Sequence, residues 1–151
     1  MDDITTSIIL ADLYIFIKED KLDEVQTLIN MYNNPDLKDN SSFYLTPADF
    51  NLLKHYNNSY LYLLDHYVPQ SPEIKRTMWK HKIDLILASS YRSDKIWNNE
   101  TIYDFIITIM ENPELQAYEI IDLIRLSIAI ENTELIITLK EKAMLLKEDN
   151  K

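Results

Sequence analysis

Apolar residues recur at helical spacing along almost the whole chain, and short polar breaks separate the apolar stretches. No two runs of strict alternation flank a turn, so the pattern contains no clear hairpin. We expect helices at residues 5–19, 21–33, 47–56, 59–67, 72–90, 100–111, 113–130 and 133–147. The sequence therefore predicts an all-α fold of helix-turn-helix pairs, and its 151 residues suit a single domain over residues 1–151.

Four prolines mark expected helix starts. Each follows a residue that commonly caps a helix N-terminus, and an acidic residue follows within two positions, where it meets the positive end of the helix dipole. These pairs are Asn34-Pro35, Thr46-Pro47, Ser71-Pro72 and Asn112-Pro113. The chain has no glycine, so we expect asparagine to take the left-handed conformation at helix ends, namely at Asn33-Asn34, Asn57-Asn58, Asn98-Asn99 and Asn132.

A similar pattern stands near both ends of the chain. Counted from Phe16, an acid follows at +4 and at +7, and aliphatic residues follow at +9 and +12. Ser127 starts the same pattern, and weaker versions start at Leu52 and Ala88, which spaces the four origins 36, 36 and 39 residues apart. Periods in this range are typical of stacked helix-turn-helix units.

Two of these segments, "IKEDKLDEVQTLIN" and "AIENTELIITLKEKA", resemble the ankyrin repeat, in which a short break precedes an acidic and aliphatic second helix. The "TPADF" segment from Thr46 is similar to the T-P-L-H motif of that family. The resemblance covers about half the chain and implies stacked helix pairs that bind a protein. An irregular helical bundle, or another solenoid of helix pairs, remains an alternative.

Composition argues against several classes of chemistry. Without glycine the chain cannot form a dinucleotide fingerprint, a P-loop or a nucleophile elbow, and without cysteine it has no disulfide or thiolate metal site. Among the three histidines, only His81 has an acid at helical spacing, Asp84, and we interpret the two as a surface ion pair. We therefore expect no catalytic residues, no metal and no cofactor.

The net charge of −10 is unevenly distributed. Residues 1–50 carry a net charge of −7 and residues from 98 onward −6, whereas residues 71–97 carry +3. The basic segment 73–87 reads as a helix that packs beside an acidic one, and RNA binding through Lys75 to Lys82 is an alternative. The longest apolar stretch, residues 7–17, is too short to span a bilayer, and the start lacks the basic region of a signal peptide, so we expect a cytoplasmic protein.

These features predict an acidic, non-catalytic protein that binds another protein, with the charge favouring a basic partner, and with no role for a membrane and little for nucleic acid. The most concrete version is an inhibitor or immunity-type protein that masks a basic toxin or effector. Acids would steer the encounter and aromatic residues would anchor it, and the residues expected to do so are Asp20, Asp23, Glu24, Tyr56, Tyr60 and Trp79. The alternative is a viral or bacterial effector with degenerate ankyrin-like repeats that binds a host protein, since the chain is rich in the Ile, Asn, Lys and Tyr of AT-rich genomes.

Overall fold

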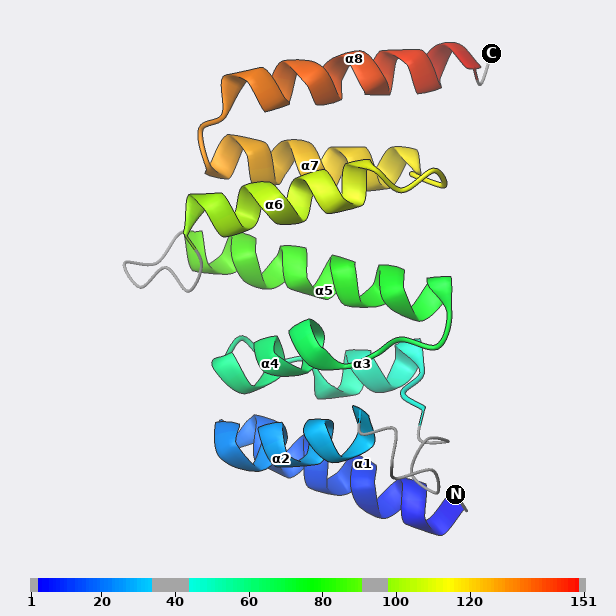
Figure 1. The fold of residues 1–151 in the computed structure, drawn as a ribbon, viewed down its shortest axis with the longest axis vertical. Coiled ribbons are helices and arrows are strands. Elements are labelled where there is room, and N and C mark those ends of the chain that lie inside the picture. Colours follow the sequence, from blue (N-terminus) through cyan, green and yellow to red (C-terminus); the bar gives the residue numbers. More distant parts are fainter. Residues whose placement is uncertain (1–2, 34–43, 91–97, 150–151) are drawn as a thin grey trace. The chain divides into compact units, whose positions relative to one another are not determined.

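The structure is a computed structural model that describes residues 3–33, 44–90 and 98–149 (Figure 1). Within these ranges it contains eight helices and no strand, which confirms the predicted all-α fold class. The chain divides into two compact units, Met1–Leu85 and Ile86–Lys151. The single domain over residues 1–151 stays a prediction.

The first unit contains four complete helices and most of a fifth. They are α1 (Asp3–Lys18), α2 (Leu22–Asn33), α3 (Pro47–Leu53), α4 (Asn58–His66) and the greater part of α5 (Pro72–Ser90). Helix α1 packs against α2, α3 and α4, and α2 also packs against α4. The core of this unit includes Leu13, Ile17, Val25, Phe50 and Leu63, all with no exposed side chain surface.

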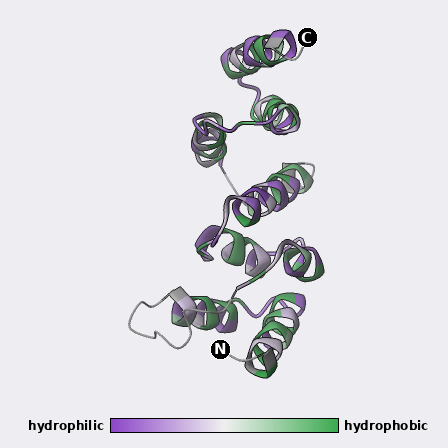
Figure 2. Ribbon diagram, turned by 90° about the vertical axis from the view of Figure 1, so that its right-hand side faces the viewer, coloured by the Kyte–Doolittle hydropathy of each residue, from purple (hydrophilic) through white to green (hydrophobic). Residues whose placement is uncertain are grey.

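The second unit contains α6 (Asn99–Met110), α7 (Ala117–Ala129) and α8 (Thr133–Asp149). Helix α7 packs against both α6 and α8, so it lies between them. Its buried residues include Ile120, Leu123 and Leu126, and the core of this unit also includes Ile106 of α6 and Leu139 of α8. In Figure 2 the turns of the helices carry both hydrophobic and hydrophilic residues.

Two of the four predicted proline starts are confirmed. Thr46 caps α3, because its hydroxyl accepts from the Asp49 amide while the Asp49 carboxylate accepts from the Thr46 amide. At the start of α5 the Ser71 hydroxyl accepts from the Ile74 amide. The start expected at Asn34-Pro35 lies outside the described residues.

The start predicted at Asn112-Pro113 is wrong, because α7 begins at Ala117. The Asn112 side chain accepts from the Glu114 amide and its carbonyl accepts from the Leu115 amide, which closes a turn instead of a helix. Four residues further on, the Glu119 carboxylate accepts from the Gln116 amide at 2.9 Å and fixes the first turn of α7. A side chain acting from inside the helix thus determines the start.

Three of the asparagines expected as left-handed stops serve as N-caps instead, and the stop expected at Asn33-Asn34 extends outside the described residues. The side chain oxygens of Asn57, Asn98 and Asn132 each accept a hydrogen bond from the amide three residues later. Among the described residues the left-handed positions are held by two acids, Asp20 at φ 53° and Glu131 at φ 55°.

These two acids occupy the matching positions of the repeated pattern. In the turn after α1, the Lys21 amide donates to the Phe16 carbonyl at 2.8 Å. In the turn after α7, the Asn132 amide donates to the Ser127 carbonyl at 3.0 Å. Both are the six-residue closure of a Schellman turn, so the pattern counted from Phe16 and Ser127 corresponds to one backbone geometry used twice. The weaker repeat from Leu52 does not share this turn geometry, since Lys54 ends α3 at φ −58°. The weaker repeat from Ala88 extends to Trp97, which lies outside the described residues.

Candidate partner-binding site

A polar joint connects the turn between α1 and α2 to the start of α4. The Asp20 carboxylate accepts from the Ser59 amide at 3.1 Å and from the Ser59 hydroxyl at 2.6 Å. In the opposite direction, the Asn57 side chain donates to the Ile17 carbonyl at 2.7 Å. The Asp20 carboxylate at the N-terminus of α4 and the side chain amide of Asn57 at the C-terminus of α1 each bind a backbone group that has no partner within its own helix. The joint thereby fixes the segment before α4 beside the α1–α2 turn.

Acidic side chains surround this turn. Asp23 and Glu24 are exposed in the first turn of α2, where the positive end of the helix dipole stabilises them. Glu19 pairs with Lys21 at 3.0 Å, and this hydrogen bond, together with the charge of Glu19, raises the pKa of Lys21. Both members of the pair are about half exposed, so the pair contributes little to stability.

Tyr56 lies next to Asn57 and therefore beside the same turn. Its side chain is 53% exposed, and the Lys54 ammonium lies 5.6 Å from the centre of its ring. The preceding residue, His55, contacts the ring of Tyr14 edge-on at 6.0 Å between centroids. We call Glu19, Asp20, Asp23, Glu24 and Tyr56 the acidic edge. Four of the six residues that the sequence singled out thus belong to the α1–α2 turn, to the first turn of α2 or to the segment that the joint fixes beside them.

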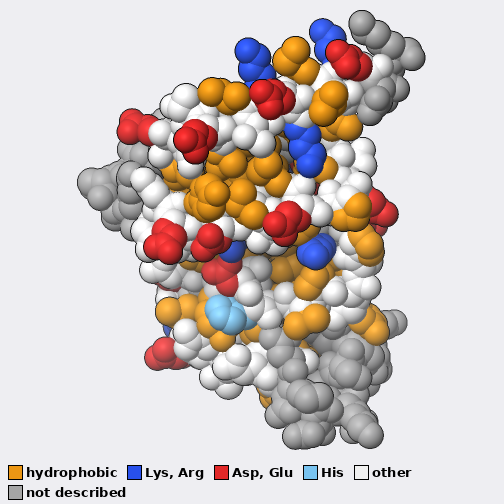
Figure 3. Space-filling view, turned by 45° about the horizontal axis from the view of Figure 1, so that its top comes forward, with side chains coloured by type: hydrophobic (Ala, Val, Ile, Leu, Met, Phe, Trp, Pro, Cys, Tyr) orange, Lys and Arg blue, Asp and Glu red, His pale blue; other side chains and the backbone are white. Residues whose placement is uncertain are grey.

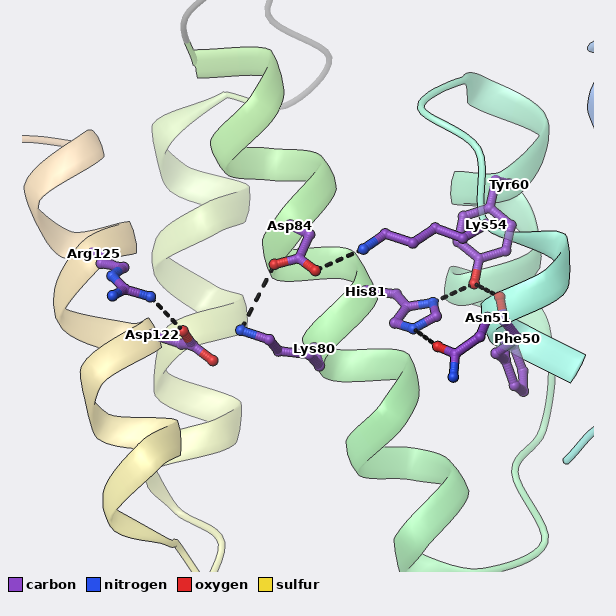
Figure 4. Close-up of polar contacts among 9 residues, drawn as sticks. All are labelled: Phe50, Asn51, Lys54, Tyr60, Lys80, His81, Asp84, Asp122 and Arg125. Atoms are coloured by element: carbon purple, nitrogen blue, oxygen red, sulfur yellow. Dashed lines mark hydrogen bonds and ion pairs between the residues drawn. The ribbon is translucent and has the colours of Figure 1, made fainter. Parts of the chain in front are cut away.

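Tyr60, the fifth, is not on the surface. Asn57 starts a new helix, so Tyr56 and Tyr60 do not share one helical face, and the Tyr60 side chain has no exposed surface. Its hydroxyl lies 3.0 Å from the Phe50 carbonyl and 2.5 Å from His81 Nδ1 (Figure 4). Burial raises the pKa of Tyr60 well above its usual value. This burial takes Tyr60 off the surface, so it is left out of the proposed partner contact.

His81 does not form the surface ion pair with Asp84 that its spacing indicated. It is 5% exposed, and its Nε2 lies 3.0 Å from the Asn51 side chain oxygen (Figure 4). Asp84 instead binds the Lys54 ammonium at 2.7 Å. Burial, followed by the charge of Lys54, lowers the pKa of His81 to about 4. His81 is therefore neutral at pH 7 and joins α5 to α3 and α4.

Trp79, the sixth residue, lies on α5, whereas the acidic edge is built from α1, α2 and the segment before α4. Its ring is partly buried, and the Lys75 ammonium lies 5.0 Å from the ring centre. The other lysines of this helix contact acids: Lys82 binds Asp65 of α4 at 2.6 Å, and Lys80 lies 3.8 Å from Asp84. Two of the three lysines of α5 therefore contact an acid, one on α5 itself and one on α4, and the predicted packing beside an acidic helix stays a prediction.

The second unit contains a groove of about 500 Å³ between the end of α6 and the second half of α8. At its side the Lys142 ammonium donates to the Met110 carbonyl at 3.3 Å, which satisfies the end of α6. The groove is lined by Ile107, Met110, Glu111, Asn112, Pro113, Leu115, Lys142 and Leu146. Figure 3 shows hydrophobic side chains among acidic ones over the helices of this unit. The groove holds no paired carboxylates or histidine that would indicate chemistry.

Within the described ranges, no three His, Asp or Glu side chains gather as a metal site. The same ranges contain no helix with the length and apolar content needed to cross a membrane. Sequence reasoning missed the Asp20–Ser59 joint. Its only signal was the serine after Asn57-Asn58, which does not reveal a contact to a distant residue.

Comparison with known proteins gives no relative. No protein-family model matches the chain, and no curated protein and no solved structure matches it significantly. We therefore infer the function from the geometry of the site.

Proposed function

We propose that this protein binds another protein through the acidic edge and performs no catalysis. The observation that carries the proposal is the joint of Asp20 with Ser59, which fixes the exposed acids of the α1–α2 turn beside the segment that carries the exposed Tyr56. Aromatic residues beside charged ones are enriched at protein interfaces, because a large stiff ring buries much area at little entropic cost. The ankyrin-like resemblance also points to protein binding.

The charge of the edge favours a basic partner. Four acids stand there against Lys18 and Lys21, and the whole chain carries −10. Complementary charge speeds the encounter and orients the partner, while the contact of the aromatic ring slows dissociation. The most concrete form is an inhibitor or immunity-type protein that masks a basic toxin or effector in the cytoplasm.

A second form is an effector with degenerate ankyrin-like repeats that binds a host protein. The two equivalent turns at Asp20 and Glu131 favour it, because a repeat protein reuses one backbone geometry. RNA binding by Lys75 to Lys82 receives less support, since Lys80 and Lys82 contact Asp84 and Asp65. To bind RNA, these two lysines would have to leave their carboxylate partners and bind phosphates instead.

The proposal is tested by comparing two triple variants in quantitative capture from the native source. One carries D23N, E24Q and Y56A at the acidic edge. The control carries E134Q, E141Q and Y118A, which removes the same charge and one tyrosine, 55% exposed, from the second unit. We expect a protein that the wild type and the control capture and that the edge variant loses.

The captured protein then gives a kinetic test. At low salt the edge variant should associate about tenfold more slowly than the control, and added salt should reduce that difference. Equal capture and equal association rates for the two triple variants would show that the acidic edge binds no partner. Unfolding midpoints measured for both variants exclude a folding defect as the cause.

A further inference from the structure

The helix pair α7–α8 has the same turn as the pair α1–α2, and shared hydrogen bonds align the two pairs. The Asp20 amide donates to the Ile17 carbonyl at 3.0 Å, and the Glu131 amide donates to the Ile128 carbonyl at 3.0 Å. Together with the two six-residue closures, these bonds match each residue of the first pair with the residue 111 positions later, as Asp20 matches Glu131. The two pairs can therefore be compared position by position.

One side of the first pair is apolar and is covered by the helices that follow it. Leu13 and Ile17 of α1 and Val25 of α2 have no exposed surface, and the helices α3 and α4 pack against this pair. The Asp20 carboxylate binds the start of α4 through Ser59. The first pair thus shows which kind of neighbour this side takes: a helix that begins at the turn acid.

The same side of the second pair is also apolar, but it is exposed to solvent. Ile128, which matches the buried Ile17, is 57% exposed. Ile124 and Ile136, which match Leu13 and Val25, are partly exposed. Glu131 is exposed at the turn. We call the set Ile124, Ile128, Glu131 and Ile136 the open face.

Burial on the other side of the two pairs supports this match. On α1, the first helix that the structure describes, Ile8 is 58% and Ile15 47% exposed. Their matches on α7, Glu119 and Leu126, are buried, and α7 has α6 packed against it. A matched position is therefore buried in the pair that has a neighbouring helix on that side. The exposure of Ile128 follows the same rule on the opposite side.

Exposure alone does not distinguish the open face, since Ile137, Met144 and Leu145 of α8 are exposed as well. Its distinction is that the matched side of the first pair shows what covers it. The match also limits its extent, because the exposed Lys140 stands where Ile29 is buried. The open face is therefore confined to the part of α7–α8 near the turn.

We propose that the open face binds a helix of a partner protein in the position that α4 takes on α1–α2. The partner helix begins at Glu131, whose negative charge complements the positive end of the helix dipole. A serine or threonine near that start, like Ser59 in α4, donates its hydroxyl and amide to the Glu131 carboxylate. The apolar side of the partner helix covers the three isoleucines, as in other complexes of amphipathic helices.

A peptide of this chain serves as the probe, because α4 is the model for the partner helix. A fluorescent peptide of residues 44–67 contains α3, the Asn57 cap and α4. In the full chain the place of these helices on α1–α2 is already occupied, so binding in trans reports the matched place on α7–α8. We expect fluorescence anisotropy to rise saturably as the full chain is added.

Two variants of the full chain locate the binding. I128E puts a charge into the open face at an exposed position, so it should weaken peptide binding about tenfold or more without lowering the unfolding midpoint. I15E is the control, because Ile15 is exposed on α1, outside the open face. A wild-type chain that binds no peptide, or equal affinities of I128E and I15E for the peptide, would overturn the proposal.

A double-mutant cycle tests the contact of Glu131 with the helix start. E131A removes the acceptor and should weaken peptide binding about tenfold, since hydrogen bonds to charged groups are the stronger ones. The S59A peptide should bind the wild type more weakly than the unmodified peptide does, and it should lose little further affinity for E131A. Fully additive losses would show that Glu131 does not bind the start of the helix, and they would contradict the proposed position.

This inference does not depend on the proposed function. The open face shares no residue with the acidic edge or with the control variant of the capture experiment. Absence of peptide binding beside capture that requires the acidic edge would reject this inference alone. Peptide binding that requires Ile128, beside equal capture by the two triple variants, would reject only the proposed function.

Discussion

The carboxylate of Asp20 binds both the amide and the hydroxyl of Ser59, a residue 39 positions further along the chain. The amide belongs to the first turn of α4, where a negative charge also meets the helix dipole. Asp20 reaches it from a left-handed backbone conformation that most residues avoid. The two hydrogen bonds offset the unfavourable conformation, so the side chain explains why an aspartate stands where glycine is usual.

Replacing the two left-handed acids by glycine should have opposite effects on stability. In D20G the strain is relieved, but the two charge-assisted hydrogen bonds are lost, and we expect a net loss of about 2 kcal/mol in the free energy of unfolding. Glu131 holds the same conformation with an exposed side chain, so E131G should gain up to about 1 kcal/mol. Urea unfolding of the two variants beside the wild type measures both values.

A second variant separates the joint from the backbone effect. S59A removes the hydroxyl and keeps the amide, so it should lower the free energy of unfolding by about 1 kcal/mol. Because D20G already removes the acceptor of that hydroxyl, the double variant D20G/S59A should lose little more than D20G alone. Equal and fully additive losses for D20G and S59A would show that the two residues do not act together.

The helices and several of their starts were accessible from the sequence because they depend on local chemistry. The capping box at Thr46 and Asp49 is formed by hydrogen bonds within four consecutive residues. The turns that begin at Phe16 and Ser127 are each closed by a hydrogen bond within six consecutive residues. The mistaken start at Pro113 is also local, since proline and asparagine suit a turn as well as a helix N-terminus.

The candidate site was only partly accessible, because its decisive contacts are between distant segments. A run of tyrosines does not reveal that Asn57 caps a new helix, which turns Tyr60 inward while Tyr56 stays exposed. The spacing of His81 and Asp84 permitted a pair, but Lys54, thirty residues earlier, binds Asp84 instead. Tertiary contacts of this kind override helical spacing.

The Tyr60 hydroxyl should contribute strongly to stability although it touches no partner. It lies between the Phe50 carbonyl and His81 Nδ1 in a fully buried position. Y60F keeps the ring packing but leaves a buried carbonyl without its donor, so we expect a loss of about 1–3 kcal/mol. Y56A, at an exposed position, should change the free energy of unfolding by no more than about 0.5 kcal/mol. Similar losses for both variants would contradict the difference in burial.

The ion pair between Lys82 and Asp65 should stabilise the packing of α5 against α4. Its nitrogen–oxygen distance is 2.6 Å, and the two side chains are 19% and 29% exposed, so water screens the pair only in part. A double-mutant cycle with K82M and D65N should give a coupling energy of about 1 kcal/mol. The exposed pair Lys21–Glu19 is the control, and a cycle with K21M and E19Q should give a smaller value that salt removes. Equal coupling in the two cycles would indicate that burial does not strengthen the inner pair.

The stability of the first unit should fall as the pH is lowered, because of His81. Its pKa is about 4 in the folded protein, below the ordinary value of 6.5, since burial and the charges of Lys54 and Lys80 outweigh the attraction of Asp84. Between these two pH values His81 is protonated in the unfolded chain but neutral in the folded protein. The contribution of neutral His81 to the free energy of unfolding is therefore complete above about pH 6.5 and is lost as the pH falls toward 4. The expected loss between pH 7 and pH 5 is about 2 kcal/mol. H81Q cannot titrate, so urea unfolding of this variant should show a much smaller change over the same range, and an equal change in both proteins would assign the effect to other groups.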